Sequence, residues 1–290
     1  MSNSNVLQQD FSEIIERIRR SFLSVYENDK DAFDEIDVSR IRNERWVIER
    51  HILDRKGNEK DAFENLVNTM KWRKSFGVNR LKATDFPQEF WEIGEAHLYV
   101  ADKNGVKPAY IRVKFHKQLS DWLEISKKFV VYLMETLDKE TNGKNWSIIW
   151  DCDGGTLFNV DIELLVFCIT TCFRYYPKGA KYYLLHELPF VLWGIYQLGR
   201  TFIPEHYRNT ICFSTRRNIA DLIGIESLPD YLGGECNKKY RGPIEGAPGI
   251  EEVAKDNDLN ENAVKKFFSH YQSFLDEARE KQPLNDEPGK

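Results

Sequence analysis

The 290-residue sequence is poor in cysteine and lacks the spacings that mark common metal sites. Its cysteines are odd in number, scattered, and form no Cys-x-x-Cys pair: Cys152, Cys168, Cys172, Cys212 and Cys236. This usage favours a reduced, intracellular environment over a disulfide-bonded fold. The six histidines show no spacing such as His-x-x-x-His, so we expect no metal site.

Several motifs that bind phosphates or carry nucleophiles are also absent. The chain has neither Gly-x-x-x-x-Gly-Lys-Ser/Thr nor Gly-x-Gly-x-x-Gly, and it has no Gly-x-Ser-x-Gly elbow. It contains no run of about 18 apolar residues that could span a membrane, and its first residues lack the apolar core of a secretory signal. We therefore expect no cofactor, no membrane span and a cytoplasmic location.

Charge and composition narrow the class of protein further. Lys and Arg number 41 against 46 Asp and Glu, so the net charge is −5, which argues against a nucleic-acid partner. Aromatic residues make up 13% of the chain, a share that is typical of thick cores or apolar cavities. A chain of this length can bury such a core without disulfides or metals.

The first third of the sequence has the periodicity of helices. Its first apolar stripe recurs at three- and four-residue spacing, at Phe11, Ile14, Ile15, Ile18 and Phe22. No proline precedes Pro87, and Gly77 is a plausible helix stop. The sequence predicts a helical lobe over residues 1–94.

From residue 95 the pattern alternates between strands and helices. Strands are predicted at 97–102, 108–115, 146–151, 181–187 and 210–215, and helices at 120–140, 160–174 and 189–203. The turn DKNG at 102–105 joins the first two strands as a hairpin, and the later alternation predicts parallel crossovers. This α/β lobe covers 95–240. A Gly/Pro linker at 241–250, an amphipathic helix at 251–281 and a disordered tail at 282–290 follow.

One segment is similar to the nucleophile loop of haloacid-dehalogenase-type phosphatases. Asp151 and Asp153 follow an apolar strand at the spacing with which such enzymes hold phosphate and magnesium. A later Asp-Asp pair, which that mechanism needs, is missing. We therefore interpret the segment as a strand end with a tight Asp-Gly turn and expect no enzyme, with a phosphatase as the alternative.

Two further features have both a structural and a functional interpretation. The predicted helix 189–203 is apolar nearly all round, so it is a central core helix, a lid over an apolar cavity or a face that meets a membrane. Basic residues such as Lys178, Arg208 and Arg216 lie near strand ends. They form either an ordinary solvated surface or a contact with an anionic headgroup or membrane.

These blocks together resemble the CRAL-TRIO family over residues 40–240. The matching stretches are MKWRKSFGV (70–78), ADKNGVKPAYIRV (101–113), IIWDCDGG (148–155), YYPKGAKYYLLHELPF (175–190) and LPDYLGG (228–234). The resemblance implies an α/β fold. Its N-terminal helical lobe is followed by a mixed, mostly parallel five-stranded sheet whose flanking helices enclose an apolar pocket. It also implies that helix 189–203 is a mobile gate.

The resemblance implies two sets of site residues. The lipid-binding set is Ile148, Trp150, Phe190, Leu192, Trp193, Ile195, Tyr196, Phe202 and Ile203. The set for headgroup or membrane contact is Arg55, Lys56, Lys178, Lys181, Arg208, Arg216 and Arg217. Lys178 replaces the family's inositol-contacting Glu. Thr210 stands where phosphatidylinositol binders have a Lys, and Trp146 and Ile148 stand where choline binders have Ser and Thr. This pattern favours a more acidic ligand, a fatty acid or an anionic membrane.

The expected function is binding, and membrane-to-membrane transfer, of a hydrophobic lipid by a protein that associates peripherally with membranes. The alternative is a non-catalytic interaction scaffold whose pocket is degenerate. The C-terminal helix carries an aromatic stripe that includes Phe267, Tyr271 and Phe274. Such a stripe is not left in water, so we expect it to dock on its own chain. Pairing as a homodimer is the next choice, and lying on a membrane is the last.

Overall fold

The computed structural model describes residues 10–280, so the tail predicted at 282–290 lies outside the described residues. The chain divides into two compact units, Met1–Arg80 and Leu81–Lys290. Each unit has its own buried core. The lobe predicted at 1–94 therefore includes residues that belong to the core of the second unit, among them Phe86 and Ile93.

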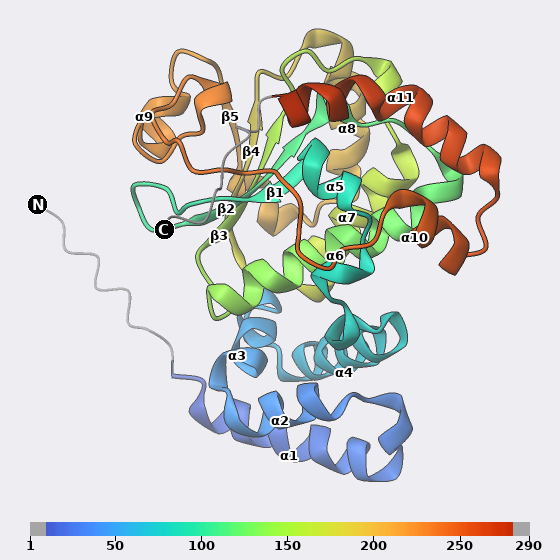
Figure 1. The fold of residues 1–290 in the computed structure, drawn as a ribbon. Helices are drawn as coiled ribbons and strands as arrows, with labels where there is room; N and C mark the ends of the chain where they lie inside the picture. Colours follow the sequence, from blue (N-terminus) through green and yellow to red (C-terminus); the bar gives the residue numbers. More distant parts are fainter. Residues whose placement is uncertain (1–9, 281–290) are drawn as a thin grey trace, which may run out of the picture. The chain divides into compact units, whose positions relative to one another are not determined.

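The first unit is a set of helices around one apolar core (Figure 1). Its helices are α1 (Ser12–Asn28), α2 (Glu35–Asn43), α3 (Arg45–Asp54) and α4 (Glu59–Phe76), with 3-10 turns η1 (Lys30–Ala32) and η2 (Val78–Arg80). The predicted stripe of α1 is buried at Ile15, Ile18 and Phe22. Gly77 ends α4 with φ at 79°, a left-handed conformation that glycine adopts without strain.

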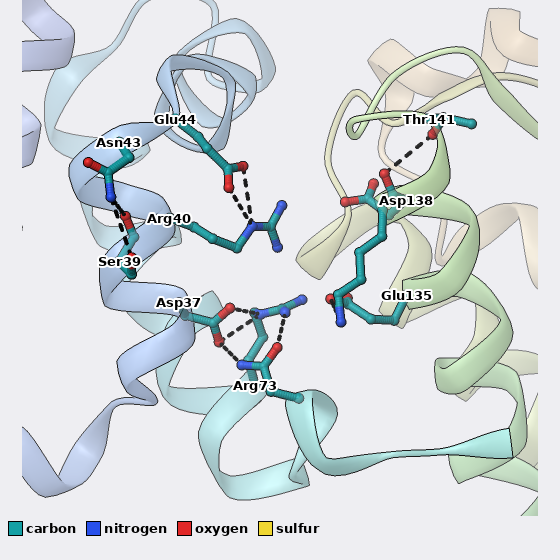
Figure 2. Close-up of polar contacts among 11 residues, drawn as sticks. Asp37, Ser39, Arg40, Asn43, Glu44, Arg73, Glu135, Asp138 and Thr141 are labelled. Carbon is teal, nitrogen blue, oxygen red and sulfur yellow. Dashed lines mark hydrogen bonds and ion pairs between the residues drawn. The ribbon is translucent and has the colours of Figure 1, made fainter. Parts of the chain in front are cut away.

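A buried ion pair joins two helices of this unit. Arg73 of α4 donates from Nε to both carboxylate oxygens of Asp37 of α2, each at 2.9 Å (Figure 2). The side-chain amide of Asn79 donates to Asp37 Oδ2 at 2.9 Å and accepts from Arg73 Nη2 at 3.2 Å. These hydrogen bonds satisfy a carboxylate that is 1% exposed, which is what keeps a buried charge tolerable.

The second unit is built on a five-stranded sheet in the order β1-β2-β3-β4-β5. The strands are β1 (Ala96–Leu98), β2 (Lys107–Arg112), β3 (Trp146–Asp151), β4 (Ala180–His186) and β5 (Ile211–Ser214). β1 pairs antiparallel with β2, and every other neighbouring pair is parallel. The predicted hairpin and the predicted mixed, mostly parallel α/β fold are therefore confirmed.

Helices cover both faces of this sheet (Figure 1). α6 (Leu123–Glu140), α7 (Ile162–Tyr175) and α8 (Trp193–Thr201) lie on one side, and α9 (Ile219–Ile223) lies on the other. The unit also contains the 3-10 turns η3 (Ala83–Asp85), η4 (Val113–Phe115), η5 (Ser120–Trp122), η6 (Leu157–Asn159), η7 (Phe190–Leu192), η8 (Glu205–Thr210) and η9 (Asp230–Leu232). Across residues 10–280, no helix is long and apolar enough to cross a membrane.

The strand side chains alternate between two buried layers. Ile149 of β3 and Leu184 of β4 belong to a cluster that also contains Tyr99, Tyr110, Ile219, Ile223 and Leu228. The next residue on each strand points to the opposite face. Because both faces are covered, the inner strands are nearly continuous apolar runs rather than alternating ones.

The C-terminal segment forms two helices instead of the single helix expected at 251–281. These are α10 (Ile250–Asp256) and α11 (Glu261–Glu280). The chain turns between them because Asp258 has φ at 55° and the side chain of Asn260 accepts from the Ala263 N–H at 3.1 Å.

The aromatic stripe of α11 is buried within the second unit. Phe267, Tyr271 and Leu275 join one core cluster with Phe86 and Phe129, and α11 packs against α5 (Gln88–Ile93). The Trp122 indole donates to the Ala263 carbonyl at 3.1 Å. The expected docking of this helix on its own chain is therefore confirmed.

Acid should destabilise the second unit through His97. Burial, with a smaller contribution from Arg112, lowers the pKa of His97 to about 3. The unfolded chain takes up its proton near pH 6.5, so it binds more protons than the folded chain between pH 6.5 and 3. The free energy of unfolding should fall across this window by roughly 4 kcal/mol from this group.

Denaturant unfolding at a series of pH values measures this effect. His97→Gln should reduce the pH dependence of the free energy of unfolding between pH 6.5 and 3. Equal slopes for His97→Gln and the parent chain would contradict the assignment.

Candidate functional site

An apolar cavity of about 230 Å³ lies inside the second unit. It is bounded by strands β1 to β5 on one side and by α6, α7 and α8 on the other, with α5 and α11 contributing further walls. The strand positions that line it are Ala96, Ile111, Trp150, Tyr183, Leu185 and Ile211. α6 and α7 contribute Leu123, Phe129, Leu164, Leu165, Cys168, Ile169 and Phe173. Concave, mostly apolar spaces of this kind are the usual form of small-molecule sites.

The cavity wall is chemically inert where cysteines reach it. Burial raises the pKa of the Cys152 thiol and of the Cys168 thiol to about 12 in each case. Both therefore remain protonated at neutral pH and act as small apolar groups.

α8 forms one wall of the cavity. Its inner face contributes Ile195, Tyr196 and Gly199, and Leu192 before it and Ile203 after it are buried. A methyl group added at Gly199 would lie 3.2 Å from Ile169 Cδ1, so glycine permits α8 to approach α7 closely. Gly194 has open space around it.

The outer side of this segment exposes large apolar side chains to water. Phe190 is 93% exposed, and Val191, Trp193, Leu198 and Phe202 are between 42% and 50% exposed. Trp193 is also within ring contact of Phe213, whose exposed fraction is 45%. Contiguous exposed apolar surface commonly marks a binding face.

The predicted lipid-binding residues divide into two groups. Trp150, Leu192, Ile195, Tyr196 and Ile203 line the cavity. The other four lie elsewhere. Ile148 is buried in β3 without lining the cavity, and Phe190, Trp193 and Phe202 point outward from the α8 segment. The all-round apolar pattern of the segment thus reflects one face on the cavity and one face in water.

None of the seven predicted headgroup cations lines the cavity. Lys178 has its ammonium 4.9 Å from the centre of the Tyr207 ring, Arg208 is half-buried in η8, and Lys181 and Arg217 are exposed. Arg216 pairs with Asp153 at 2.5 Å between Nη2 and Oδ2. Arg55 and Lys56 belong to the first unit, where Arg55 lies 3.2 Å from the Asp54 carboxylate.

The Asp151-x-Asp153 segment has the geometry of a turn. The Asp153 N–H donates to Asp151 Oδ1 at 3.2 Å, and the Arg112 guanidinium lies 3.9 Å from Asp151 Oδ2. Burial raises the pKa of Asp151, against the opposing effects of that hydrogen bond and of Arg112. Within residues 10–280, no group of three His, Cys, Asp or Glu side chains is arranged to hold a metal ion.

Sequence reasoning missed two contributors to the cavity. Phe267 and Tyr271 of α11 line it, although their apolar stripe indicated only that the helix packs somewhere. The second is a polar corner formed by Glu95, His116 and Asp161, three lining residues. These three residues are far apart in the sequence, so no local pattern predicted that the topology would bring them together.

The polar corner is held by a chain of hydrogen bonds. The Tyr271 hydroxyl donates to Glu95 Oε2 at 3.2 Å, and Glu95 Oε1 lies 2.7 Å from His116 Nδ1. Burial alone would lower the pKa of His116, but the Glu95 and Asp161 carboxylates outweigh burial and raise it. The imidazole is therefore more readily charged than an ordinary histidine.

Comparison with known proteins places this unit in a family. The model of the CRAL/TRIO domain matches residues 96–234, which contain all five strands and helices α6 to α9. Residues 96–234 form a CRAL/TRIO domain. In the crystal structure of Sfh5 the fold is similar, with a TM-score of 0.64 over 89% of this chain and 98% of that chain at 14% identity.

Curated relatives of the CRAL/TRIO domain are distant in sequence. A CRAL-TRIO domain-containing protein of Schizosaccharomyces pombe is 22% identical over 68% of this chain and 47% of its own. Phosphatidylinositol transfer protein CSR1 of Eremothecium gossypii is 25% identical over 52% and 35%. Protein real-time of Drosophila melanogaster is 24% identical over 69% and 34%. The matched segments thus span between about a third and a half of the length of these relatives.

Removal of a core side chain from α11 should destabilise the CRAL/TRIO unit. Leu275 is fully buried, so Leu275→Ala removes apolar contacts and leaves a cavity at a cost of about 2 to 5 kcal/mol. Ser273→Ala, an exposed change on the same helix, should cost less than about 0.5 kcal/mol. Chemical denaturation compares the two, and equal stabilities would show that α11 is not part of the core.

Proposed function

We propose that this protein binds a hydrophobic lipid in the cavity of its CRAL/TRIO domain and carries it between membranes. The observation that carries the proposal is an apolar cavity whose walls come from the sheet, α7 and α8. The existence of a relative described as a phosphatidylinositol transfer protein supports lipid handling. The open cavity also argues against the alternative of a scaffold with a degenerate pocket.

Burial of the lipid tail supplies the binding energy in this proposal. Each buried CH₂ contributes about 0.8 kcal/mol, so a tail of about 16 carbons gains roughly 13 kcal/mol as an upper bound. This gain offsets most of the cost of taking the tail out of a bilayer. No bond is made or broken, and we propose no enzymatic step.

We propose that α8 with η7 is the gate through which the lipid passes. Its inner face closes the cavity while its outer face exposes Phe190, Trp193 and Phe202. A membrane surface would cover that outer face, so the gate would open where lipid is to be exchanged. The protein would then associate with membranes peripherally and transiently.

The ligand that we propose is a hydrophobic lipid and is not restricted to phosphatidylinositol. At the positions that correspond to the family's inositol and choline contacts, this chain has different residues. Lys178, at one of these positions, lies against Tyr207 instead of lining the cavity. The placement of Lys178 gives no support to the acidic ligand that its charge suggested. A neutral lipid is therefore part of the proposal.

We also propose a relation, within the family, to the CRAL-TRIO part of motile sperm domain-containing protein 2. The segments that support it are WEIGEAHLYVADKNG (91–105), YIRVKFH (110–116) and YYPK (175–178). These segments supply Glu95 and His116, two residues of the polar corner.

The gate proposal predicts the effect of a charge on the outer face of α8. Trp193→Asp should weaken binding to anionic phosphatidylserine/phosphatidylcholine vesicles and slow uptake of a fluorescent lipid, by about tenfold or more. The reason is that a carboxylate resists transfer out of water. Vesicle sedimentation and the rate of lipid uptake measure the two effects.

Leu222→Asp provides the matched control for this test. Leu222 is 41% exposed on α9, compared with 45% for Trp193, but α9 covers the other face of the sheet. It should leave both measurements near the parent values. Equal effects of the two changes would show that α8 has no special role at the membrane.

The phosphatase alternative has its own test. Asp151→Asn should leave lipid uptake within about twofold of the parent, because Asp151 does not line the cavity. Hydrolysis of para-nitrophenyl phosphate should be absent with and without magnesium. A magnesium-dependent activity that Asp151→Asn abolishes would overturn the non-catalytic assignment.

A further inference from the structure

The polar corner of the cavity contains a buried nitrogen with no hydrogen-bond partner. His116 Nδ1 is engaged by Glu95, but His116 Nε2 is shielded from solvent and receives no partner from the described residues. A buried polar atom without a hydrogen-bond partner costs about 1 to 3 kcal/mol, so such an atom calls for an explanation. Nε2 belongs to a residue that lines the cavity.

Asp161 faces this nitrogen across a gap. Its Oδ2 lies 4.0 Å from His116 Nε2, which is too long for a hydrogen bond. Its other oxygen, Oδ1, accepts from the Leu164 N–H at 3.0 Å and so caps the start of α7. One oxygen is thus used to hold the helix, while the other is directed to His116 beside the cavity.

We infer that His116 and Asp161 together recognise a hydroxyl group, so that the ligand class is a long-chain or polycyclic alcohol. This inference rests on the proposed lipid-binding function. A hydroxyl oxygen accepts from Nε2–H and donates to Asp161 Oδ2, so one group satisfies both atoms. Both residues line the cavity, so a small rotation of the Asp161 side chain admits the ligand hydroxyl between the two atoms while the His116 ring keeps its place.

Other polar groups fit this pair less well. A carboxylate or phosphate only accepts hydrogen bonds at neutral pH, so it would place a negative charge beside Asp161 and Glu95 in an apolar space. An ester carbonyl can accept from His116 but leaves Asp161 without a donor. The Glu95 carboxylate only accepts, so Nδ1 carries a hydrogen towards it, and Nε2 carries one as well when the imidazole is charged, the state that the raised pKa of His116 favours.

The rest of the polar corner holds the His116 ring in place. Glu95 is fixed by the Tyr271 hydroxyl from α11, and the Asn159 amide donates to the carbonyls of Lys114 at 3.0 Å and His116 at 2.9 Å. These contacts orient the imidazole before a ligand arrives. Pre-organised polar groups in an apolar pocket are what gives orientation and specificity to a ligand.

Equilibrium binding of hexadecanol and hexadecanoate, two probes with the same tail, tests the inference. The parent chain should bind hexadecanol about tenfold more tightly, the size expected for one additional satisfied hydrogen bond. Asp161→Asn keeps an acceptor for the helix cap but replaces the facing carboxylate by an amide donor. This change should abolish or reverse the preference.

Glu163→Gln is the matched control. It removes the same charge from the first turn of α7, but Glu163 is exposed and pairs with Lys127. It should keep the parent preference. A parent chain that prefers hexadecanoate, or an unchanged preference in Asp161→Asn, would overturn the hydroxyl site while leaving lipid binding intact.

Two further readouts keep the test decisive. If neither probe binds to the parent or the control, the proposed lipid-binding function itself is wrong. Should Asp161→Asn fail to fold, ¹⁵N chemical shifts of His116 in the parent chain answer the question. Hexadecanol should shift the Nε2 signal much more than the Nδ1 signal, and no response at Nε2 would overturn the inference.

Discussion

Parallel pairing of β2, β3, β4 and β5 determines where the candidate functional residues lie. Strands that run in the same direction end at the same edge of the sheet, so the segments after them meet there. His116 follows β2, Asp161 follows β3, and the α8 segment follows β4. The cavity and its polar corner are thus consequences of one hydrogen-bonding pattern.

The second determinant is the packing of α11, which lies outside the matched CRAL/TRIO segment. Phe267 contributes both to the core with Phe86 and Phe129 and to the cavity wall. Tyr271 contributes to the wall and holds Glu95. Stability of the unit and the shape of its cavity therefore depend on the same helix.

Much of the fold could be predicted from the sequence, because the strands are apolar runs bounded by turn residues. The strand predicted at 146–151 has those bounds in the structure. The site was harder to predict. The apolar stripe of α11 shows which side of the helix is buried, but it does not show that Phe267 reaches the cavity. The segment around α8 is apolar on all sides, so its sequence does not show that Phe190 faces water. Glu95 and Asp161 lie 21 and 45 residues from His116 in the sequence, a separation that no local pattern reports.

The lengths of the strands have a consequence for association between molecules. The inner strands have six or seven residues, while the outer strands β1 and β5 have only three and four. An outer strand presents unpaired N–H and C=O groups, and long flat edges of this kind recruit strands from other chains. Short outer strands limit such recruitment, so the sheet is protected against edge-to-edge aggregation even though α8 leaves aromatic side chains in water.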